Sequence, residues 1–253
     1  LNIHYADESG VIRMADHDVY NLNSFVQVAE DMFDRVVGFM GRKDMDTEFK
    51  EHPVLLVAPD DGAFGYVKEA SGMLKSYIKD KYGKEMDVYS GYLDKKRLGG
   101  KKVVISGSVL EDEGKPLSSV DVKDCWVFVL DDETSWGSTL LAANYALVRK
   151  SGAAWHRVLT GVVHGKLAQG MKPFYTGLEE EEILEAMNAG KNIEPRPEYI
   201  NEAEELMPPR LFLCTRSVSL PEGFPEANSA SIGPIIGFAV KRRWRDKVDE
   251  QTA

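Results

Sequence analysis

The chain has 253 residues, of which 43% are apolar, and it carries a formal net charge of −10 at pH 7. This length and composition allow a sizeable buried core and exclude a disordered chain. The acidic balance argues against nucleic acid as the main partner, because binding to phosphate backbones needs a basic surface. No apolar run approaches the roughly 20 residues of a membrane span and no signal-peptide pattern is present, so no membrane partner is expected.

Two details bear on the cellular setting. Both cysteines, Cys125 and Cys214, lie in apolar runs. We therefore expect buried thiols rather than a disulfide or a metal site, which fits a reducing cytosol and a cytoplasmic location. The sequence begins at Leu1 rather than Met, which suggests a clipped or engineered N-terminus.

Strand and helix patterns alternate along the chain. The expected strands cover residues 54–58, 88–93, 103–110, 125–130, 157–164 and 211–218. The expected helices cover residues 23–40, 67–83, 140–148, 176–190 and 234–244. Ser24 and Gln27 fit a capping box for the first helix, and Gly41 ends it. This alternation predicts an α/β fold, with a mostly parallel sheet and helices on both faces.

The most informative stretch joins a buried strand to an acidic pair and a hydroxyl-rich turn. Six apolar residues, 125–130, lead to Asp131 and Asp132, and a helical pattern follows the turn. Ligands of open α/β sheets lie at the carboxyl ends of strands, and anions bind at helix N-termini. The residue types suggest a sugar phosphate, whose ribose hydroxyls would bind the carboxylates. The hydroxyl groups available for its phosphate belong to Ser135, Ser138 and Thr139.

Each part of this stretch also has a simpler interpretation. An Asp pair after a strand often only forms a turn, and Ser or Thr before a helix often only caps it. The order of the whole segment, from apolar to acidic to small to helical, favours the binding site.

Other segments carry charge or histidine. The basic segment 93–102 suggests a mobile flap that closes over a polyphosphate, although an exposed hairpin with solvated lysines is the alternative. The turn that contains Asp60 and Asp61 follows a strand and suits a metal or a diphosphate. His17, between two acids, and His164, at a strand end, are ambiguous by themselves.

Together these segments resemble the C-terminal half of ribose-phosphate diphosphokinases (phosphoribosyl diphosphate synthetases), which have the type I phosphoribosyltransferase fold. Residues 131–139 look like the ribose-5-phosphate loop that this superfamily shares. Lys95 and Arg97 match the Lys-x-Arg pair of the synthetases' catalytic flexible loop. The similarity spans roughly residues 14–245 in consistent order, and it implies a single domain over the whole chain with an N-terminal segment at 1–50.

The resemblance also assigns the ambiguous residues. The segment around Asp60 is similar to the Pro-Asp-x-Gly-Gly stretch that handles metal and diphosphate, and His17 sits where the synthetases place a metal-binding Asp-x-His. His164 resembles the histidine of their Thr-His-Gly strand end. The resemblance thus implies Mg²⁺ as cofactor, with His17 and Asp60 helping to place it.

Several departures separate this chain from the family. The family's first half, which supplies much of the ATP site, is absent from this sequence, and residues 178–209 look like an insertion. Ser138 replaces a glycine of the phosphate loop, and Trp136 stands where the family has a small residue. Trp136 either packs outward under the flap or the insertion, or it stacks on a flat group of the acceptor, such as the adenosine of ADP-ribose.

The resemblance implies an enzyme that transfers the β,γ-diphosphoryl group of ATP to the anomeric hydroxyl of ribose 5-phosphate or of a larger acceptor. Lys95 and Arg97 would stabilise the transferred group, and Asp131 and Asp132 would orient the ribose. The 5-phosphate would be held by Ser135, Gly137, Ser138 and Thr139. The alternatives are a phosphoribosyltransferase that forms a nucleotide and a non-catalytic synthetase-like subunit. We expect a homo-oligomer or a partner chain that completes the ATP site.

Overall fold

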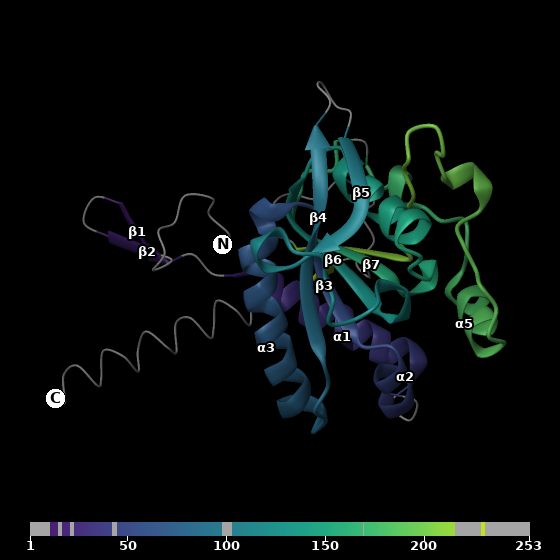
Figure 1. Cartoon of the computed structure of the whole chain (residues 1–253), viewed down its shortest axis with the longest axis horizontal. Helices are drawn as coiled ribbons and strands as arrows, with labels where there is room; N and C mark the ends of the chain where they lie inside the picture. Colours follow the sequence, from purple (N-terminus) through teal and green to yellow (C-terminus); the bar gives the residue numbers. More distant parts are fainter. Residues whose placement is uncertain are drawn as a thin grey trace.

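A seven-stranded sheet with the strand order β5-β4-β3-β6-β7-β8-β9 forms the centre of the computed structural model (Figure 1). The structure describes residues 11–14, 17–20, 23–41, 45–97, 103–168, 170–215 and 229–230, without the side chains of 11–20, 96–97, 103 and 229–230. The strands of this sheet are β3 (Val54–Ala58), β4 (Val88–Arg97), β5 (Val103–Leu110), β6 (Trp126–Thr134), β7 (Val158–Gly165), β8 (Leu211–Thr215) and β9 (Ser229–Ala230). All neighbouring pairs are parallel except β4 and β5. A second sheet contains only the antiparallel pair β1 (Val11–Met14) and β2 (His17–Tyr20).

Helices cover both faces of the seven-stranded sheet (Figure 1). They are α1 (Phe25–Met40), α2 (Met45–Glu51), α3 (Phe64–Tyr82), α4 (Ser138–Tyr145) and α5 (Glu180–Asn188). Because side chains alternate along a strand, Leu55 and Val57 join the apolar cluster of α4 and α5, whereas Leu56 and Ala58 join that of α1 and α3. The predicted α/β fold is confirmed. None of the described helices combines the length and the apolar character that crossing a membrane requires.

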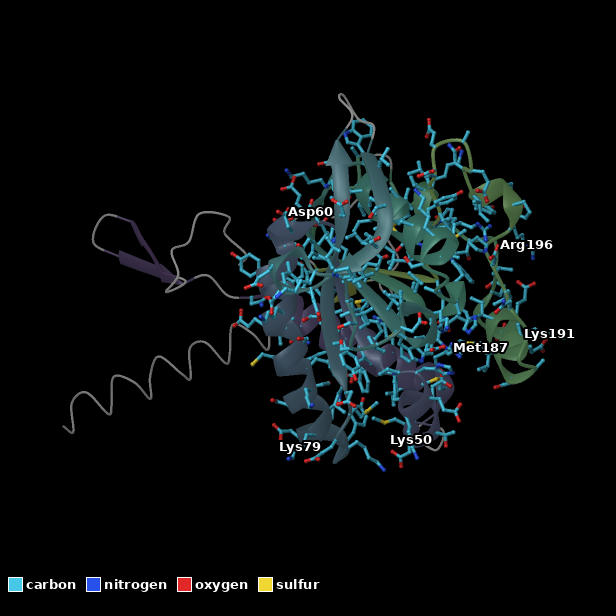
Figure 2. All side chains as sticks on the ribbon, in the orientation of Figure 1. Lys50, Asp60, Lys79, Met187, Lys191 and Arg196 are labelled. Carbon is cyan, nitrogen blue, oxygen red and sulfur yellow. The ribbon has the colours of Figure 1, made fainter. Side chains whose placement is uncertain are left out.

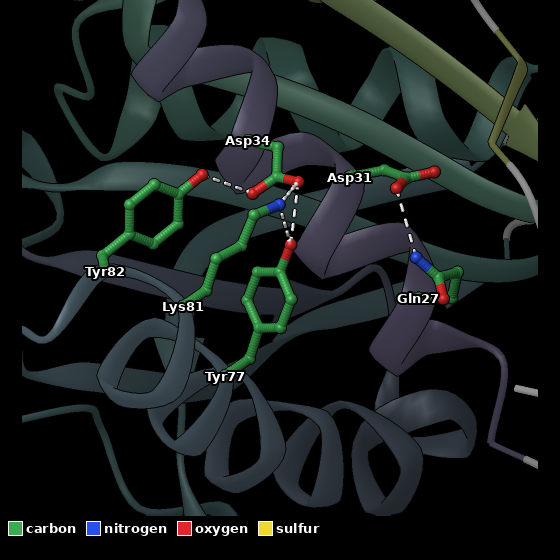
Figure 3. A network of polar contacts seen from close by, with 6 residues as sticks. All are labelled: Gln27, Asp31, Asp34, Tyr77, Lys81 and Tyr82. Atoms are coloured by element: carbon green, nitrogen blue, oxygen red, sulfur yellow. Dashed lines mark hydrogen bonds and ion pairs between the residues drawn. The ribbon is translucent and has the colours of Figure 1, made fainter. Parts of the chain in front are cut away.

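A polar network fixes α1 against α3 (Figure 3). The Tyr77 and Tyr82 hydroxyls donate to the two carboxylate oxygens of Asp34 at 2.8 and 2.7 Å, and Lys81 forms an ion pair with the same carboxylate. Burial and the hydrogen bond to the negatively charged Asp34 raise the pKa of Tyr82 to about 12, although the Lys81 charge opposes the shift. Both tyrosines therefore stay protonated donors at neutral pH, and the two helices are held in a fixed orientation.

The start of α1 differs from the predicted capping box. Ser24 is the N-cap residue but makes no side-chain cap hydrogen bond, and Gln27 donates to Asp31 instead. Asn23 Oδ1 accepts the hydrogen bond from the Phe25 backbone N–H at 3.1 Å, and Asn23 also donates to Tyr66 of α3. Docking against α3 thus selected a different cap from the one that the local pattern favoured.

Two strands are longer than predicted, and two predicted segments lie outside the described residues. The strand β4 continues through Arg97, and β6 continues through Thr134, because each keeps pairing with a neighbouring strand beyond its apolar run. The acidic pair after residue 130 and residues 94–97 of the basic segment therefore lie in strands rather than loops. Residues 216–218 of the predicted last strand and the predicted helix 234–244 lie outside the described residues.

Close packing of α1 on the sheet depends on Gly161 of β7. A Cβ at this position would lie 2.3 Å from Val28 Cγ1 and 2.9 Å from Met32 Sδ. The absence of a side chain lets the helix approach the strand. Gly38, also in α1, has nothing within 4 Å of its Cβ position.

These two glycines give a matched test of the packing. Gly161→Ala should lower the free energy of unfolding by about 1–3 kcal/mol, because the added methyl group overpacks the interface. Gly38→Ala should raise it by about 0.5–1 kcal/mol, because alanine favours the helix and meets no neighbour. Urea unfolding of both variants measures the difference, and an unchanged stability for Gly161→Ala would contradict the packing.

Candidate functional site

Predicted site residues gather where parallel strands end. The strands β3, β6 and β7 are neighbours and parallel, so their carboxyl ends share one edge of the sheet. The register places Asp131 beside Val162 and Glu133 beside His164. Asp60, which is labelled in Figure 2, follows β3 after a single proline. Ligands of open α/β sheets bind at this edge.

An ion pair joins two of these residues. Lys95 Nζ lies 2.7 Å from Asp60 Oδ2, although 35 residues separate them in the chain. The other oxygen, Asp60 Oδ1, accepts a hydrogen bond from the Gly62 backbone N–H at 3.2 Å. Only 6% of the Lys95 side chain is exposed. Its charge is therefore weakly screened by water, and an anionic ligand at this edge would interact with it strongly.

The conformation of β4 explains how Lys95 reaches Asp60. The pairing of β4 with β5 is regular at Leu93, which faces Val109, and shifts before Lys95, which faces Ile105. Such a bulge redirects the side chains that follow it. The predicted flap thus begins as an antiparallel arm of the sheet. Residues 98–102 and the side chain of Arg97 lie outside the described part of the structure.

Asp131 lies in the same charged cluster. Its Oδ1 accepts a hydrogen bond from the Asp132 backbone N–H at 3.0 Å. Burial, followed by the nearby negative charges of Asp132 and Asp60, raises the pKa of the Asp131 carboxyl to about 8. Near neutral pH this group therefore exists in both protonation states, so it is able to donate or accept a hydrogen bond with a sugar hydroxyl.

The turn between β6 and α4 is shaped by hydrogen bonds and by one glycine. Thr134 Oγ1 accepts from the Gly137 backbone N–H at 3.1 Å, and Ser135 O accepts from the Ala168 N–H at 2.7 Å. Gly137 has φ +77°, and a Cβ there would lie 2.7 Å from the Phe174 ring. Left-handed backbone and close aromatic packing both require glycine at this position.

The predicted phosphate-binding residues surround this turn. Gly137 is the N-cap residue of α4, and Ser138 and Thr139 form its first turn. Ser135, Ser138 and Thr139 are each partly exposed. Helix N-termini present backbone N–H groups that favour anions. The Trp136 side chain is 45% exposed next to this turn.

His164 lies across from the acidic end of β6. Its register partner Glu133 forms an ion pair with Lys166 at 2.5 Å. Burial lowers the pKa of His164, while the nearby charges of Asp132 and Glu133 oppose that shift. His164 therefore lies close to the predicted ribose-binding carboxylates, as its position at a strand end suggested.

The described residues support a metal site only in part. They contain no group of three or more His, Cys, Asp or Glu side chains that would hold a metal ion alone. Asp60 lies in the charged cluster at the strand ends, but the side chain of His17, in β2, lies outside the description. The proposed pairing of His17 with Asp60 around a metal stays a prediction.

Sequence reasoning missed two residues that shape the site. Thr134 was within the informative stretch, but nothing in the pattern distinguished its role in holding Gly137 from that of the other hydroxyls. Phe174 lies in a 3₁₀ turn, Lys172–Phe174, and stacks on Phe212 of β8 with ring centroids 4.0 Å apart. Its contact with Gly137 depends on the tertiary fold, and no local signal identifies it.

Comparisons with known proteins give structural neighbours only. No protein-family model and no curated protein sequence matches the chain. The phosphoribosylpyrophosphate synthetase from Mycobacterium smegmatis is 17% identical with a TM-score of 0.41, and the match covers 86% of this chain and 51% of the synthetase. The chain thus spans about half the length of that synthetase.

Two transferases are similar over a shorter stretch. The purine phosphoribosyltransferase from Pyrococcus horikoshii is 18% identical with a TM-score of 0.31, over 57% of this chain and 77% of that one. The hypoxanthine phosphoribosyltransferase from Trypanosoma cruzi, in complex with the product IMP, is 12% identical with a TM-score of 0.33, over 57% and 68%.

The raised pKa of Asp131 predicts a pH-dependent stability. In the unfolded chain this carboxyl ionises near pH 4, whereas in the folded chain it ionises near pH 8. Its contribution to stability is therefore complete below pH 4 and is lost as the pH rises to about 8. Asp131→Asn keeps the acceptor for the Asp132 N–H and should flatten the dependence between pH 5 and 8. Urea unfolding across this range measures it, and equal slopes for the two proteins would contradict the shift.

Proposed function

We propose that the chain transfers the β,γ-diphosphoryl group of ATP to the anomeric hydroxyl of a 5-phosphorylated ribose. The ion pair between Lys95 and Asp60, in the same charged cluster as Asp131, carries this proposal. These three residues come from distant segments, yet they gather at the carboxyl edge of the sheet beside the turn that opens α4. A buried cation next to sugar-binding carboxylates and a phosphate turn suits the transfer of a charged group to a sugar phosphate.

In the proposed reaction the anomeric oxygen attacks the β-phosphorus of ATP. The bond from that phosphorus to the α,β-bridging oxygen breaks, AMP leaves with the bonding electrons, and the hydroxyl proton is released to solvent. Asp131 and Asp132 would orient the ribose hydroxyls. The turn residues Ser135, Gly137, Ser138 and Thr139 would hold the 5-phosphate. Lys95 would leave Asp60 for the transferred group, and Lys95 and Arg97 would stabilise the charge of that group.

The acidic edge also fits Mg²⁺. This ion usually takes only one or two protein carboxylates together with substrate phosphates and water. Asp60 would take that role together with His17, and a cation would also relieve the charge repulsion that, after burial, raises the pKa of Asp131. When bound, Mg²⁺ would neutralise charge on the ATP phosphates. In this proposal a second copy or a partner chain would complete the ATP site.

The test is AMP formation by the purified chain with ATP, Mg²⁺ and either ribose 5-phosphate or ADP-ribose. Lys95→Ala should lower kcat by about 100-fold or more with little change in acceptor affinity, because it removes a contact that matters most in the transition state. Lys115→Ala is the matched control, since Lys115 is exposed and forms an ion pair with Glu113, two residues away. Full activity of Lys95→Ala would reject the assigned role.

Two other outcomes would replace the proposal. Release of diphosphate from phosphoribosyl diphosphate and a nucleobase, without AMP from ATP, would identify a phosphoribosyltransferase. No turnover by the chain in either assay, alone or as an assembled oligomer, would favour a non-catalytic subunit.

The exposed side chain of Trp136 favours an acceptor larger than ribose 5-phosphate, such as ADP-ribose. Base stacking on an aromatic side chain contributes about 1–3 kcal/mol. If ADP-ribose is the acceptor, Trp136→Ser should lower kcat/KM for it by about tenfold and leave ribose 5-phosphate unaffected. Met73→Ser, at a similarly exposed position on α3, is the control. Equal losses with both acceptors would show that Trp136 packs against protein rather than against the substrate.

A further inference from the structure

The ion pair between Lys95 and Asp60 joins a pair of strand ends to the rest of the sheet. The pairing of β3 with β4 stops at Tyr92 of β4. Further along β4, Lys95–Arg97 pair with Val103–Ile105 of β5, and we call these two segments the arm (Figure 1). Within the described residues no strand pairs with β4 on the other side of the arm. On that side, the ion pair joins the arm to the turn after β3.

Asp60 is open to solvent although the protein already uses both of its carboxylate oxygens. Asp60 Oδ2 lies 2.7 Å from Lys95 Nζ, and Oδ1 accepts a hydrogen bond from the Gly62 N–H at 3.2 Å. The Asp60 side chain is 32% exposed, whereas that of Lys95 is 6% exposed. The carboxylate is therefore the part of this ion pair that meets an incoming cation first.

One carboxylate does not hold Lys95 and a divalent cation equally well. Mg²⁺ prefers carboxylate oxygens, which are the same atoms that the Lys95 ammonium contacts. Two cations on one carboxylate repel each other, and water screens this repulsion only weakly because the Lys95 side chain is nearly buried. Lys95 and a divalent cation therefore compete for Asp60.

The loss of Asp60 as a partner would force Lys95 to move. A nearly buried ammonium without its carboxylate keeps the cost of desolvation and loses the attraction that offsets it. The β4 side of the arm is free to follow, because it lies beyond the bulge and has no partner strand toward β3. The β5 side is anchored separately, since Lys150 Nζ donates to Ile105 O at 2.9 Å.

We propose that Lys95 leaves Asp60 when this carboxylate takes a divalent cation, and that its departure releases the β4 side of the arm. Without the cation, the ion pair keeps the ammonium on Asp60. With the cation, the ammonium turns to the anionic groups of the substrate. The inference rests on the proposed function, which supplies the cation and the anionic substrate, and it adds an order of events in which the cation binds before Lys95 acts.

Metal binding by a Lys95 variant tests the competition without any turnover. Mn²⁺ titrated into the full chain should broaden the nuclear magnetic resonance signal of the Gly62 N–H, which contacts Asp60. Lys95→Met keeps an apolar side chain but removes the competing charge, so the apparent Mn²⁺ affinity should rise by about tenfold. Lys68→Met is the matched control, because it breaks an exposed ion pair with Asp112 and should leave the affinity unchanged. Equal affinities in Lys95→Met and the wild type would overturn the proposal.

Hydrogen exchange tests the release of the arm. Mg²⁺ at saturation should speed the exchange of the backbone N–H groups of Lys95–Arg97 by about tenfold in the wild type, because local opening becomes easier. The N–H groups of Val54–Ala58 in β3 serve as the internal control and should not change. In Lys95→Met the arm should already exchange fast, with no further effect of Mg²⁺. Exchange of the wild-type arm that does not respond to Mg²⁺ would contradict the release.

The outcomes for this inference and for the proposed reaction are separable. Tighter Mn²⁺ binding by Lys95→Met, without AMP formation by the wild type, would support the competition and reject the transfer. AMP formation without a saturable effect of Mn²⁺ at Gly62 would support the transfer and overturn the competition.

Discussion

The parallel pairing of β3, β6 and β7 is the constraint on which the rest of the structure depends. These strands are almost completely buried on both faces, so their register is fixed by packing as well as by backbone hydrogen bonds. Parallel strands end at the same edge. The acidic residues that follow the apolar runs of β3 and β6 are therefore brought together, although their charges repel, because the buried strands cannot move apart.

This repulsion is balanced within the fold. The Lys95 side chain is almost buried and forms an ion pair with Asp60. Asp131 reduces the repulsion by keeping a proton, because burial and the neighbouring carboxylates raise its pKa to about 8. Such a cluster is less stable than an apolar edge of the same size, and perturbed carboxyls of this kind are typical of functional sites. A ligand that brings its own hydroxyls, phosphates and cation would satisfy the same groups better than the protein alone does.

The segment 166–209 links the two ends of the molecule. Near the carboxyl edge its Phe174 packs under Gly137 and fixes the turn that opens α4. Near the amino end of β7, His156 and the C-terminal end of α5 line a cavity of about 260 Å³. In the same segment, Arg196 packs against Gly177, and the Arg196 backbone N–H donates to the Thr176 carbonyl oxygen. The apparent insertion is thus part of the packed structure, and Ile183 of α5 is buried in the core.

The sequence by itself determined the order of the strands β3 to β8 and of the helices α1, α3, α4 and α5, because apolar periodicity and glycine positions are local signals. It also determined the mostly parallel sheet and the strand end that carries Asp131 and Asp132, but it did not predict α2, β1, β2 or β9. It also selected Lys95 and Asp60, but it did not show that they meet. The contact between Lys95 and Asp60 required the bulge in β4. Docking between segments that are distant in sequence produced the Asn23 cap of α1 and the packing of Phe174 on Gly137. Contacts of this kind depend on how whole elements pack, so only the tertiary structure decided them.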